Sequence, residues 1–540
     1  MNTKKYILLS IAAVLIGMSS CDKYLNVEPD NRVSVDTPDK VRQLLINAYP
    51  NGDYNVVTEL SADNFFDNAS PNSAGVYVEI TAFNRMDDDI FAWNDPQSYT
   101  NDGNSPYDLW QRYYQSIASA NAALQAIDEI FQKGGVSAAD SSKILLPCKG
   151  EALILRAYSH FMLVNIFSKA YKDAEKSKSD LGIRYVTAPI NEVTTESKRN
   201  SVAEVYDLIA KDIEAGIGLI DDALYKTATN YHFNTKAAHA FAAQFYLFKR
   251  DYAKVIEHAN VVLGSNPSSV LRDWTTTYSN SDLYAYSYID ANVPANLLIL
   301  PTYSTFFRRF INSRYEYNDI SGRGSIDDNG PTWNGRAPFA NGWMWTYNPS
   351  LGSFMAKSKE QFEYTDKVAR IGYPHIVRTE YTTDATLLDR AEAYIFLNQI
   401  DNAVADLQAW NLSHKSTSVL TKAVINNFYT PNRTYFSYTF HNQELSPEFT
   451  VTADQKPFVD CVLHFRRLDK IFEGTRWFDI KRYGIELEHV IGHGATRIKL
   501  TYDDERRAIQ IPSDVIGAGV EPNPRPTAEI SPDIIPYRVE

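Results

Sequence analysis

The chain contains two stretches that read as copies of one another, Phe245–Ala259 (FYLFKRDYAKVIEHA) and Ala393–Leu407 (AYIFLNQIDNAVADL). They align without a gap although they lie far apart in the sequence. The matched positions are Tyr246 with Tyr394, Phe248 with Phe396, and Val255-Ile256 with Ala403-Val404. In each stretch, apolar residues recur at helical spacing on both sides of a polar interruption. Each stretch is therefore predicted to form two helices joined by a short turn.

The polar interruptions, Arg250-Asp251 and Asn398-Gln399, mark the two turns. A helix–turn–helix unit of this kind is typical of tetratricopeptide-like repeats, which stack to bury faces that a single helix leaves open. The copies lie too far apart for a tandem array, so we expect a different kind of sequence between them. The predicted fold class is all-α dominated, with tetratricopeptide-like helix pairs forming a right-handed superhelical scaffold that carries long loop-rich insertions.

Other helices are expected on both sides of the first copy. Ser201 is followed by Glu204 at the spacing of a capping box, and Thr37-Pro38 is a helix start signal. A further segment, 150–171, is apolar almost all round, which indicates a helix packed between others. The predicted helical segments are 37–49, 105–131, 150–171 and 201–220.

The segment from Ser265 to Glu380 has a different character. It is rich in Gly, Pro, Asn, Ser and aromatic residues and has little helical periodicity. Long ordered loops on a rigid scaffold often carry function, and exposed aromatic rings can pack against the C–H faces of sugar rings. The candidate ligand-binding aromatic residues are Trp274, Tyr284, Tyr286, Trp333, Trp343 and Trp345.

A second candidate region precedes the first long helix. The loop LSADNFFDNAS contains Asp63 and Asn64, whose polar side chains would complement an aromatic platform. Trp93 lies nearby in the sequence, but we interpret it as a core residue.

The N-terminus has the pattern of an export signal. Two lysines precede the apolar run ILLSIAAVLIGMSS, which is too short to span a bilayer and stops at Cys21. The sequence before Cys21 resembles a bacterial lipobox, in which the cysteine is acylated and becomes the first mature residue. A cleaved leader with a chance cysteine is the alternative. The predicted organisation is a signal peptide (1–20), a lipidated tether (21–36) and one domain (37–540), with the scaffold at about 37–264 and 381–484, the aromatic insert at about 265–380 and a loop-rich tail at about 485–540.

Charge and cysteine content exclude several classes of protein. The net charge of −13 disfavours nucleic acid or an anionic membrane surface as a partner. After Cys21 only Cys148 and Cys461 remain, so at most one disulfide can form, and whether these two pair is open. No second apolar segment approaches membrane-spanning length.

Common catalytic and metal-binding motifs are missing. The sequence lacks His-Glu-x-x-His, Cys-x-x-Cys, a phosphate-binding Gly-x-x-x-x-Gly-Lys and a Gly-x-Ser-x-Gly elbow. We therefore predict no catalytic residue and no cofactor. The oxygen-rich segments Asp327–Gly330 and Met86–Ile90 leave calcium as a weaker alternative to solvated turns.

Taken in order, these pieces resemble the SusD/RagB family of nutrient-binding lipoproteins of the Bacteroidota. The resemblance rests on CDKYLNVEPDN (21–31), LWQRYYQSIASANAAL (109–124), EALILRAYSHFMLVNIFSKAY (151–171), LLDRAEAYIFLNQIDNAVADLQAWN (387–411) and RRLDKIFEGTRWFDIKRYG (466–484). The five segments occur in this order between residues 21 and 484, so the resemblance extends over nearly the whole chain. The closing segment IPSDVIGAGVEPNPRP departs from the family pattern in its last residues.

The resemblance implies an outer-membrane lipoprotein, exposed at the cell surface, that captures oligosaccharides and passes them to a SusC-like TonB-dependent β-barrel transporter. In some family members the ligand is a peptide, so glycan and peptide both stay open. The segment EGTRWFDIKRYG concentrates charge around Trp477, but we interpret it as structural, with Arg476 and Asp479 in buried polar pairs. An exported α-helical glycoside hydrolase or lyase, and a repeat adaptor that binds only proteins, are the alternatives.

Overall fold

The computed structural model describes residues 35–70, 84–95, 98–189, 198–274, 284–311, 313–317, 325–340, 345–348, 352–433, 438–492 and 496–526. The predicted leader, Cys21 and most of the tether lie outside these ranges. Within them, no helix combines the length and the apolar character needed to cross a bilayer.

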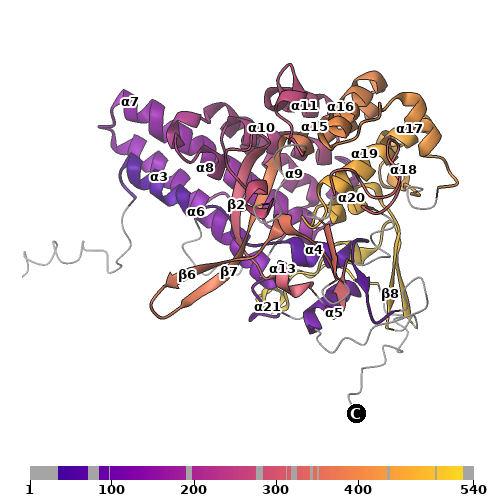
Figure 1. The fold of residues 1–540 in the computed structure, drawn as a ribbon. Coiled ribbons are helices and arrows are strands. Elements are labelled where there is room, and N and C mark those ends of the chain that lie inside the picture. The colour runs from indigo at the N-terminus through magenta and orange to yellow at the C-terminus, as the bar shows by residue number, and fades with distance from the viewer. Residues whose placement is uncertain are drawn as a thin grey trace, which may run out of the picture.

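The N-terminal part of the scaffold is a layer of long helices (Figure 1). The helix start at Thr37 is confirmed, because its hydroxyl accepts a hydrogen bond from the Lys40 amide. Ser201 and Glu204 form the predicted capping box. The apolar segment 150–171 lies in a helix packed between two others, as expected. These elements are α3 (Pro38–Ile46), α6 (Pro106–Lys133), α7 (Ala138–Asp140), the π-helical turn η1 (Ser141–Leu145), α8 (Leu146–Phe167) and α9 (Val202–Gly216).

Two glycines allow α8 and α9 to cross closely. A Cβ added to Gly150 would lie 2.8 Å from the carbonyl oxygen of Gly216, and one added to Gly216 would lie 2.8 Å from Leu153 Cβ. Larger residues at either position would push the helices apart.

The two copies form the helix pairs that the sequence predicts. They are α10 (Thr235–Lys249) with α11 (Tyr252–Leu263), and α15 (Thr383–Phe396) with α16 (Ile400–Ser413). The second pair stacks on the first, and the ring of Tyr252 lies parallel to that of Phe396 with centroids 4.6 Å apart. The helix-dominated, tetratricopeptide-like fold class is therefore confirmed.

The C-terminal helices close the core behind the second pair. The long ones are α17 (Lys422–Phe428), α19 (Lys456–Asp469) and α20 (Arg476–Tyr483), and shorter helices lie along the lower edge of Figure 1 or in the loops. The short helices are α4 (Asn55–Ser61), α5 (Arg85–Phe91), α12 (Tyr284–Tyr288), α13 (Phe306–Arg309), α18 (Asn442–Leu445) and α21 (Ser513–Gly517). Cys148 and Cys461 are both buried and free, so they do not pair.

The insert contains more regular structure than the sequence predicts. β2 (Asn296–Tyr303), β7 (Ile371–Thr382) and β6 (Gln361–Asp366) form an antiparallel sheet in the order β2-β7-β6. The purely loop-rich prediction for 265–380 is thus wrong in part, because β2 pairs with a strand from the far end of the insert and this partner is invisible in the local pattern. The remaining strand pairs are β1 (Phe66–Asp67) with β3 (Tyr315–Glu316), β4 (Trp345–Asn348) with β5 (Gly352–Met355), and, in the C-terminal tail, β8 (Leu487–Ile491) with β9 (Thr496–Leu500).

Candidate functional site

Trp274 does not present an accessible ring. Its side chain is 2% exposed and packs against Phe339, with centroids 5.2 Å apart, and against His414 at 5.5 Å. The prediction that Trp274 is a ligand platform is wrong, because residues remote in the sequence cover the ring.

Tyr286 is accessible. It lies on α12 with half of its side chain exposed, and Lys359 Nζ lies 5.4 Å from its ring centroid. Tyr284 is on the same helix and Trp345 is on β4, but their side chains, and all of Trp343, lie outside the described residues. Ligand binding by these three stays a prediction.

Trp333 is half-buried and firmly positioned. Its indole N–H donates to the carbonyl oxygen of Asp328 at 3.2 Å. The ring packs along α19, with centroids 6.0 Å from Phe465 and 5.8 Å from His464. The chain passes beside the ring at Gly330, where a Cβ would lie 2.1 Å from the indole. These contacts hold Trp333 in one orientation while part of the ring stays open to solvent.

Charged and amide side chains surround this ring. Arg336 Nε donates to Asp327 Oδ1 at 2.5 Å, and Arg433 Nη2 lies 3.9 Å from Asp328 Oδ1. Asp328 Oδ2 has no hydrogen-bond partner among the described residues. An aromatic ring flanked by acceptors and guanidinium donors is able to pack on a sugar ring and bind its hydroxyl groups. We call Asp327, Asp328, Asn329, Trp333, Arg336 and Arg433 the Trp333 surface.

Sequence reasoning missed most of this polar set. The sequence indicates that Asp327–Gly330, next to Trp333, are solvated turn residues, with calcium binding as the weaker alternative. Arg433 comes from a loop about 100 residues later, so no local pattern pointed to it.

The acidic groups weighed for calcium face arginines. Besides the Asp327–Arg336 pair, Asp87 lies 2.7 Å from Arg309 in α13, and Asp88 lies 3.1 Å from Arg314. These are ion pairs rather than an oxygen cage, and calcium at either segment stays an untested prediction.

Asp63 is part of the folded framework. Arg476 donates two hydrogen bonds of 2.9 Å to its carboxylate, and Arg467 lies 3.6 Å away. Burial by itself would raise the pKa of Asp63, but Arg467 and Arg476 lower it well below its ordinary value. The carboxylate is therefore committed to the two arginines, and the prediction that Asp63 binds a ligand is wrong.

The side chain of Asn64 also lies in the interior. Its side chain is fully buried, donates to Glu59 at 2.8 Å and accepts from Arg467 Nε at 2.9 Å. The ligand-binding prediction for Asn64 is wrong for the same reason. Trp93, expected in the core, is buried there and donates to the carbonyl oxygen of Ser61.

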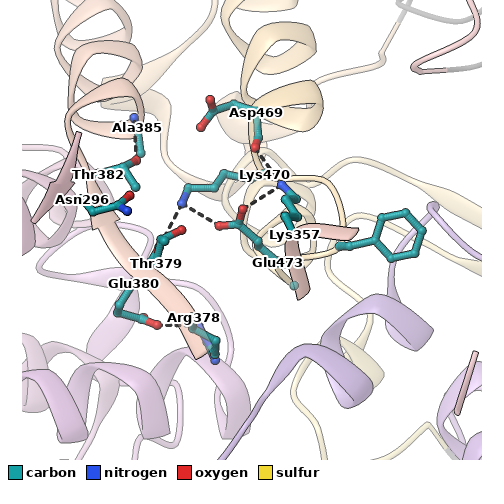
Figure 2. Close-up of polar contacts among 12 residues, drawn as sticks. Asn296, Lys357, Arg378, Thr379, Glu380, Thr382, Ala385, Asp469, Lys470 and Glu473 are labelled. Atoms are coloured by element: carbon teal, nitrogen blue, oxygen red, sulfur yellow. Dashed lines mark hydrogen bonds and ion pairs between the residues drawn. The ribbon is translucent and has the colours of Figure 1, made fainter. Parts of the chain in front are cut away.

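The segment 466–484 lies at the centre of a buried ionic network. Figure 2 shows Lys470 and Lys357 both reaching Glu473, each at 2.7 Å, while Lys357 also donates to the carbonyl oxygen of Asp469 at 3.0 Å. Burial alone would raise the pKa of Glu473, but the two lysines lower it to about 2. The network joins the insert to α19 and its following turn.

The second half of that segment is structural, as expected. Trp477 is fully buried, Arg476 is paired with Asp63, and Asp479 lies 2.6 Å from Arg482 and 3.2 Å from Arg466. These pairs confirm the interpretation of EGTRWFDIKRYG as a packing element.

A buried group beside the network has metal-ligand chemistry. One ligand atom each of Asp384, His414 and Asp469 lie within 4.8 Å of one another. Burial raises the pKa of Asp384, and the nearby Arg272 opposes this rise. The Arg272 amide donates to Asp384 at 3.2 Å, and Lys357 lies close to Asp469. Because these cations already compensate the acids, we assign no metal to the group.

The interior leaves little room for a ligand. A cavity of about 30 Å³ lies between α8, α10, α15 and α20, with Glu380, Asp389 and Lys470 in its wall. This volume holds one or two water molecules rather than a sugar ring. This cavity is therefore not a site for a sugar.

Comparison with known proteins agrees with this fold. The family model described as "Starch-binding associating with outer membrane", a SusD-like family, matches residues 23–247. A SusD-like protein, P38 of Formosa agariphila, is 21% identical over an alignment that covers 89% of this chain and 92% of that protein. The chain is thus similar to SusD-like proteins, by the family model over residues 23–247 and by this relative over most of its length.

Solved structures of SusD superfamily proteins have a similar fold. A SusD superfamily protein of Bacteroides thetaiotaomicron superposes with a TM-score of 0.60 at 18% identity, covering 91% of this chain and all of that one. A SusD-like carbohydrate binding protein of Bacteroides vulgatus gives a TM-score of 0.54 at 14% identity and covers 89% of this chain and 96% of that one. The Trp333 surface lies beyond the residues that the family model matches.

Proposed function

We propose that this SusD-like protein binds oligosaccharides at the outer face of the outer membrane and delivers them to a SusC-like TonB-dependent transporter. The observation that carries the proposal is the Trp333 surface, a held but accessible indole among carboxylate, amide and guanidinium groups. The description of the matching family and the carbohydrate-binding neighbour support a glycan as the ligand.

The expected affinity is modest. An exposed ring that buries about 50 Å² of a sugar contributes about 1 kcal/mol. Hydrogen bonds to hydroxyl groups add about 1 kcal/mol each. One or two rings with a few such bonds correspond to a dissociation constant between roughly millimolar and tens of micromolar, which suits capture followed by release.

We further propose that acylated Cys21 anchors the protein. The lipobox-like sequence and the outer-membrane description of the family support this. Two or more acyl chains give durable anchoring, whereas one is marginal.

Binding without cleavage is part of the proposal. Glycoside hydrolysis needs two carboxyl groups at a defined separation, one with a raised pKa. Burial raises the pKa of Asp87 to about 6 and that of Asp389 to about 6, but these two acids are buried against Arg309 and Arg466. At the Trp333 surface, Asp327 is paired with Arg336.

Affinity electrophoresis tests the proposal. The chain from Asp22 onward is run through gels that contain starch, xylan, laminarin, a β-mannan or a pectin, and the same mixtures are analysed for reducing ends. The proposal expects retardation by at least one polysaccharide with no new reducing ends. Retardation by none of a broad panel, or release of products, would contradict it.

A further inference from the structure

The β6–β7 hairpin extends beyond the body of the protein (Figure 1). β7 pairs with β2 from His375 to Thr382, while β6 pairs only with its outer half, Ile371 to His375. The hairpin beyond His375 is therefore a two-stranded ribbon without a third strand. Such ribbons have little stability of their own in water.

This ribbon is unusually apolar for an exposed element. Val368 at its tip is 96% exposed, Ile371 61%, Tyr364 48% and Phe362 46%. They make up four of the twelve large hydrophobic side chains that are exposed in the described part of the chain. Exposed apolar residues gathered at one place mark an interaction surface.

The geometry of the aromatic residues argues against a sugar as the occupant. The rings of Phe362 and Tyr364 meet edge to face, with centroids 4.9 Å apart and planes inclined by 67°. They offer no continuous flat face on which a sugar ring packs.

The tip itself combines an aliphatic residue with two cations. Asp366 forms the turn, because its carboxylate accepts from the amides of Val368 at 2.8 Å and Ala369 at 2.9 Å. Lys367 and Arg370 lie on either side of Val368 and are exposed. Glu363 and Asp366 of the same ribbon are exposed as well, so the ribbon carries two bases and two acids. Apolar side chains beside Lys and Arg are typical of elements that enter a membrane interface. Because the net charge of −13 disfavours attraction of the whole chain to an anionic surface, insertion here rests on the exposed apolar side chains.

The hairpin base lies near the place where the chain enters the body. Tyr373 of β7 packs against Tyr303 at 5.9 Å, and the Tyr303 amide donates to the carbonyl oxygen of Asn51 at 2.8 Å. Asn51 follows α3 by a few residues, and the described chain begins just before α3. About 14 residues separate Cys21 from Val35, so a lipid on Cys21 lies within about 50 Å of Val35.

We propose that the tip of the β6–β7 hairpin inserts into the membrane interface as a second contact beside the lipid. Val368 enters deepest, Ile371 and Tyr364 lie at the level of the headgroups, and Lys367 and Arg370 reach lipid phosphates. A lipid on residue 21 fixes one point of the body, and a second contact fixes its tilt. The inference rests on the proposed membrane anchoring of the protein, but not on its glycan ligand.

A site-specific fluorophore tests the insertion. The chain from Asp22 onward, with an N-terminal histidine tag in place of the lipid, is held on vesicles of phosphatidylethanolamine, phosphatidylglycerol and a nickel-chelating lipid. Val368→Cys carries the environment-sensitive dye NBD, because Cys148 and Cys461 are buried. Val419→Cys, at a position also exposed but placed after α16, is the matched control.

Insertion predicts at least a twofold rise in NBD fluorescence at position 368 with quenching by spin-labelled lipid, and no change at position 419. The double variant Lys367→Glu with Arg370→Glu should abolish the rise. An unchanged signal at 368, or equal changes at both positions, would overturn the proposal. If the fluorescence rises only when detergent-solubilised transporter is added, and not on vesicles, the hairpin binds a protein partner. That result would also overturn the proposal. Because the histidine tag replaces the lipid, the fluorescence result does not depend on whether Cys21 is acylated. It also does not depend on the outcome of the glycan assay.

Discussion

Glu392 Oε1 lies 2.9 Å from Arg482 Nη1, and its other oxygen lies 2.7 Å from Arg466. All three side chains are buried where α15 meets α19 and α20, and the hydroxyl of Tyr483 donates to the same carboxylate at 2.7 Å. One acid thus joins the second helix pair to the C-terminal segment that follows it.

Glu392→Gln should lower the free energy of unfolding by about 3 kcal/mol at pH 7, because it removes one charged partner from two buried guanidinium groups, which then keep Asp479 and Asp389. Urea denaturation measures the loss. Glu129→Gln, which alters an exposed pair with Lys133, is the control and should change stability by less than about 0.5 kcal/mol.

The same pair predicts a pH dependence. Burial alone would raise the pKa of Glu392, but Arg482 and Arg466 lower it from 4.5 to about 2. A carboxyl group with a lowered pKa stabilises the fold above its unfolded value and loses that contribution as pH falls through its folded value. The difference between wild type and Glu392→Gln should therefore shrink between about pH 4.5 and 2. A difference that stays constant over this range would contradict the ion-pair account.

Asp63→Asn should weaken the fold and leave glycan binding unchanged. The substitution removes the charge that faces Arg476 and Arg467, and a hydrogen bond to a charged group contributes about 2 kcal/mol. Thermal unfolding measures the first effect, and gel retardation by a bound polysaccharide measures the second. Reduced retardation by a folded Asp63→Asn protein would restore Asp63 as a ligand contact.

Gly484→Ala should destabilise the protein more than Gly492→Ala. Both glycines have positive φ, 63° and 53°, which costs an alanine about 1 kcal/mol. At Gly484, which ends α20, a Cβ would also lie 3.1 Å from His441 and Leu445, whereas the space at Gly492 is open. Equal losses in chemical denaturation would show that the crowding at Gly484 relaxes freely.

Local signals predicted the helices well. The two copies became α10–α11 and α15–α16, and both turns contain the expected break, where Arg250 and Asn398 adopt left-handed backbone with φ of 66° and 57°. Helix caps at Thr37 and Ser201 were also readable, because a cap depends on residues within one turn of the chain.

Contacts between residues far apart in the chain could not be predicted from local sequence patterns. The β2–β7 pairing joins Leu300 to Arg378, and the burial of Trp274 depends on Phe339 and His414, none of which a local window contains. Ligand binding in the candidate region stays a prediction. Trp274 and Asn64 are interior and Asp63 is held by two arginines, whereas Tyr286 is exposed and Trp333 is half-buried. Arg433 joins the Trp333 surface only through folding.

The affinity of Trp333→Ala for a polysaccharide that retards the wild-type protein tests the central claim most directly. Isothermal titration is the measurement, and Tyr231→Ala, which truncates an exposed ring elsewhere, is the control. Loss of about 1 kcal/mol of apolar contact predicts a dissociation constant raised about five- to tenfold for Trp333→Ala and unchanged for Tyr231→Ala. An unchanged affinity in a folded Trp333→Ala protein would contradict the assignment of the Trp333 surface as the glycan site.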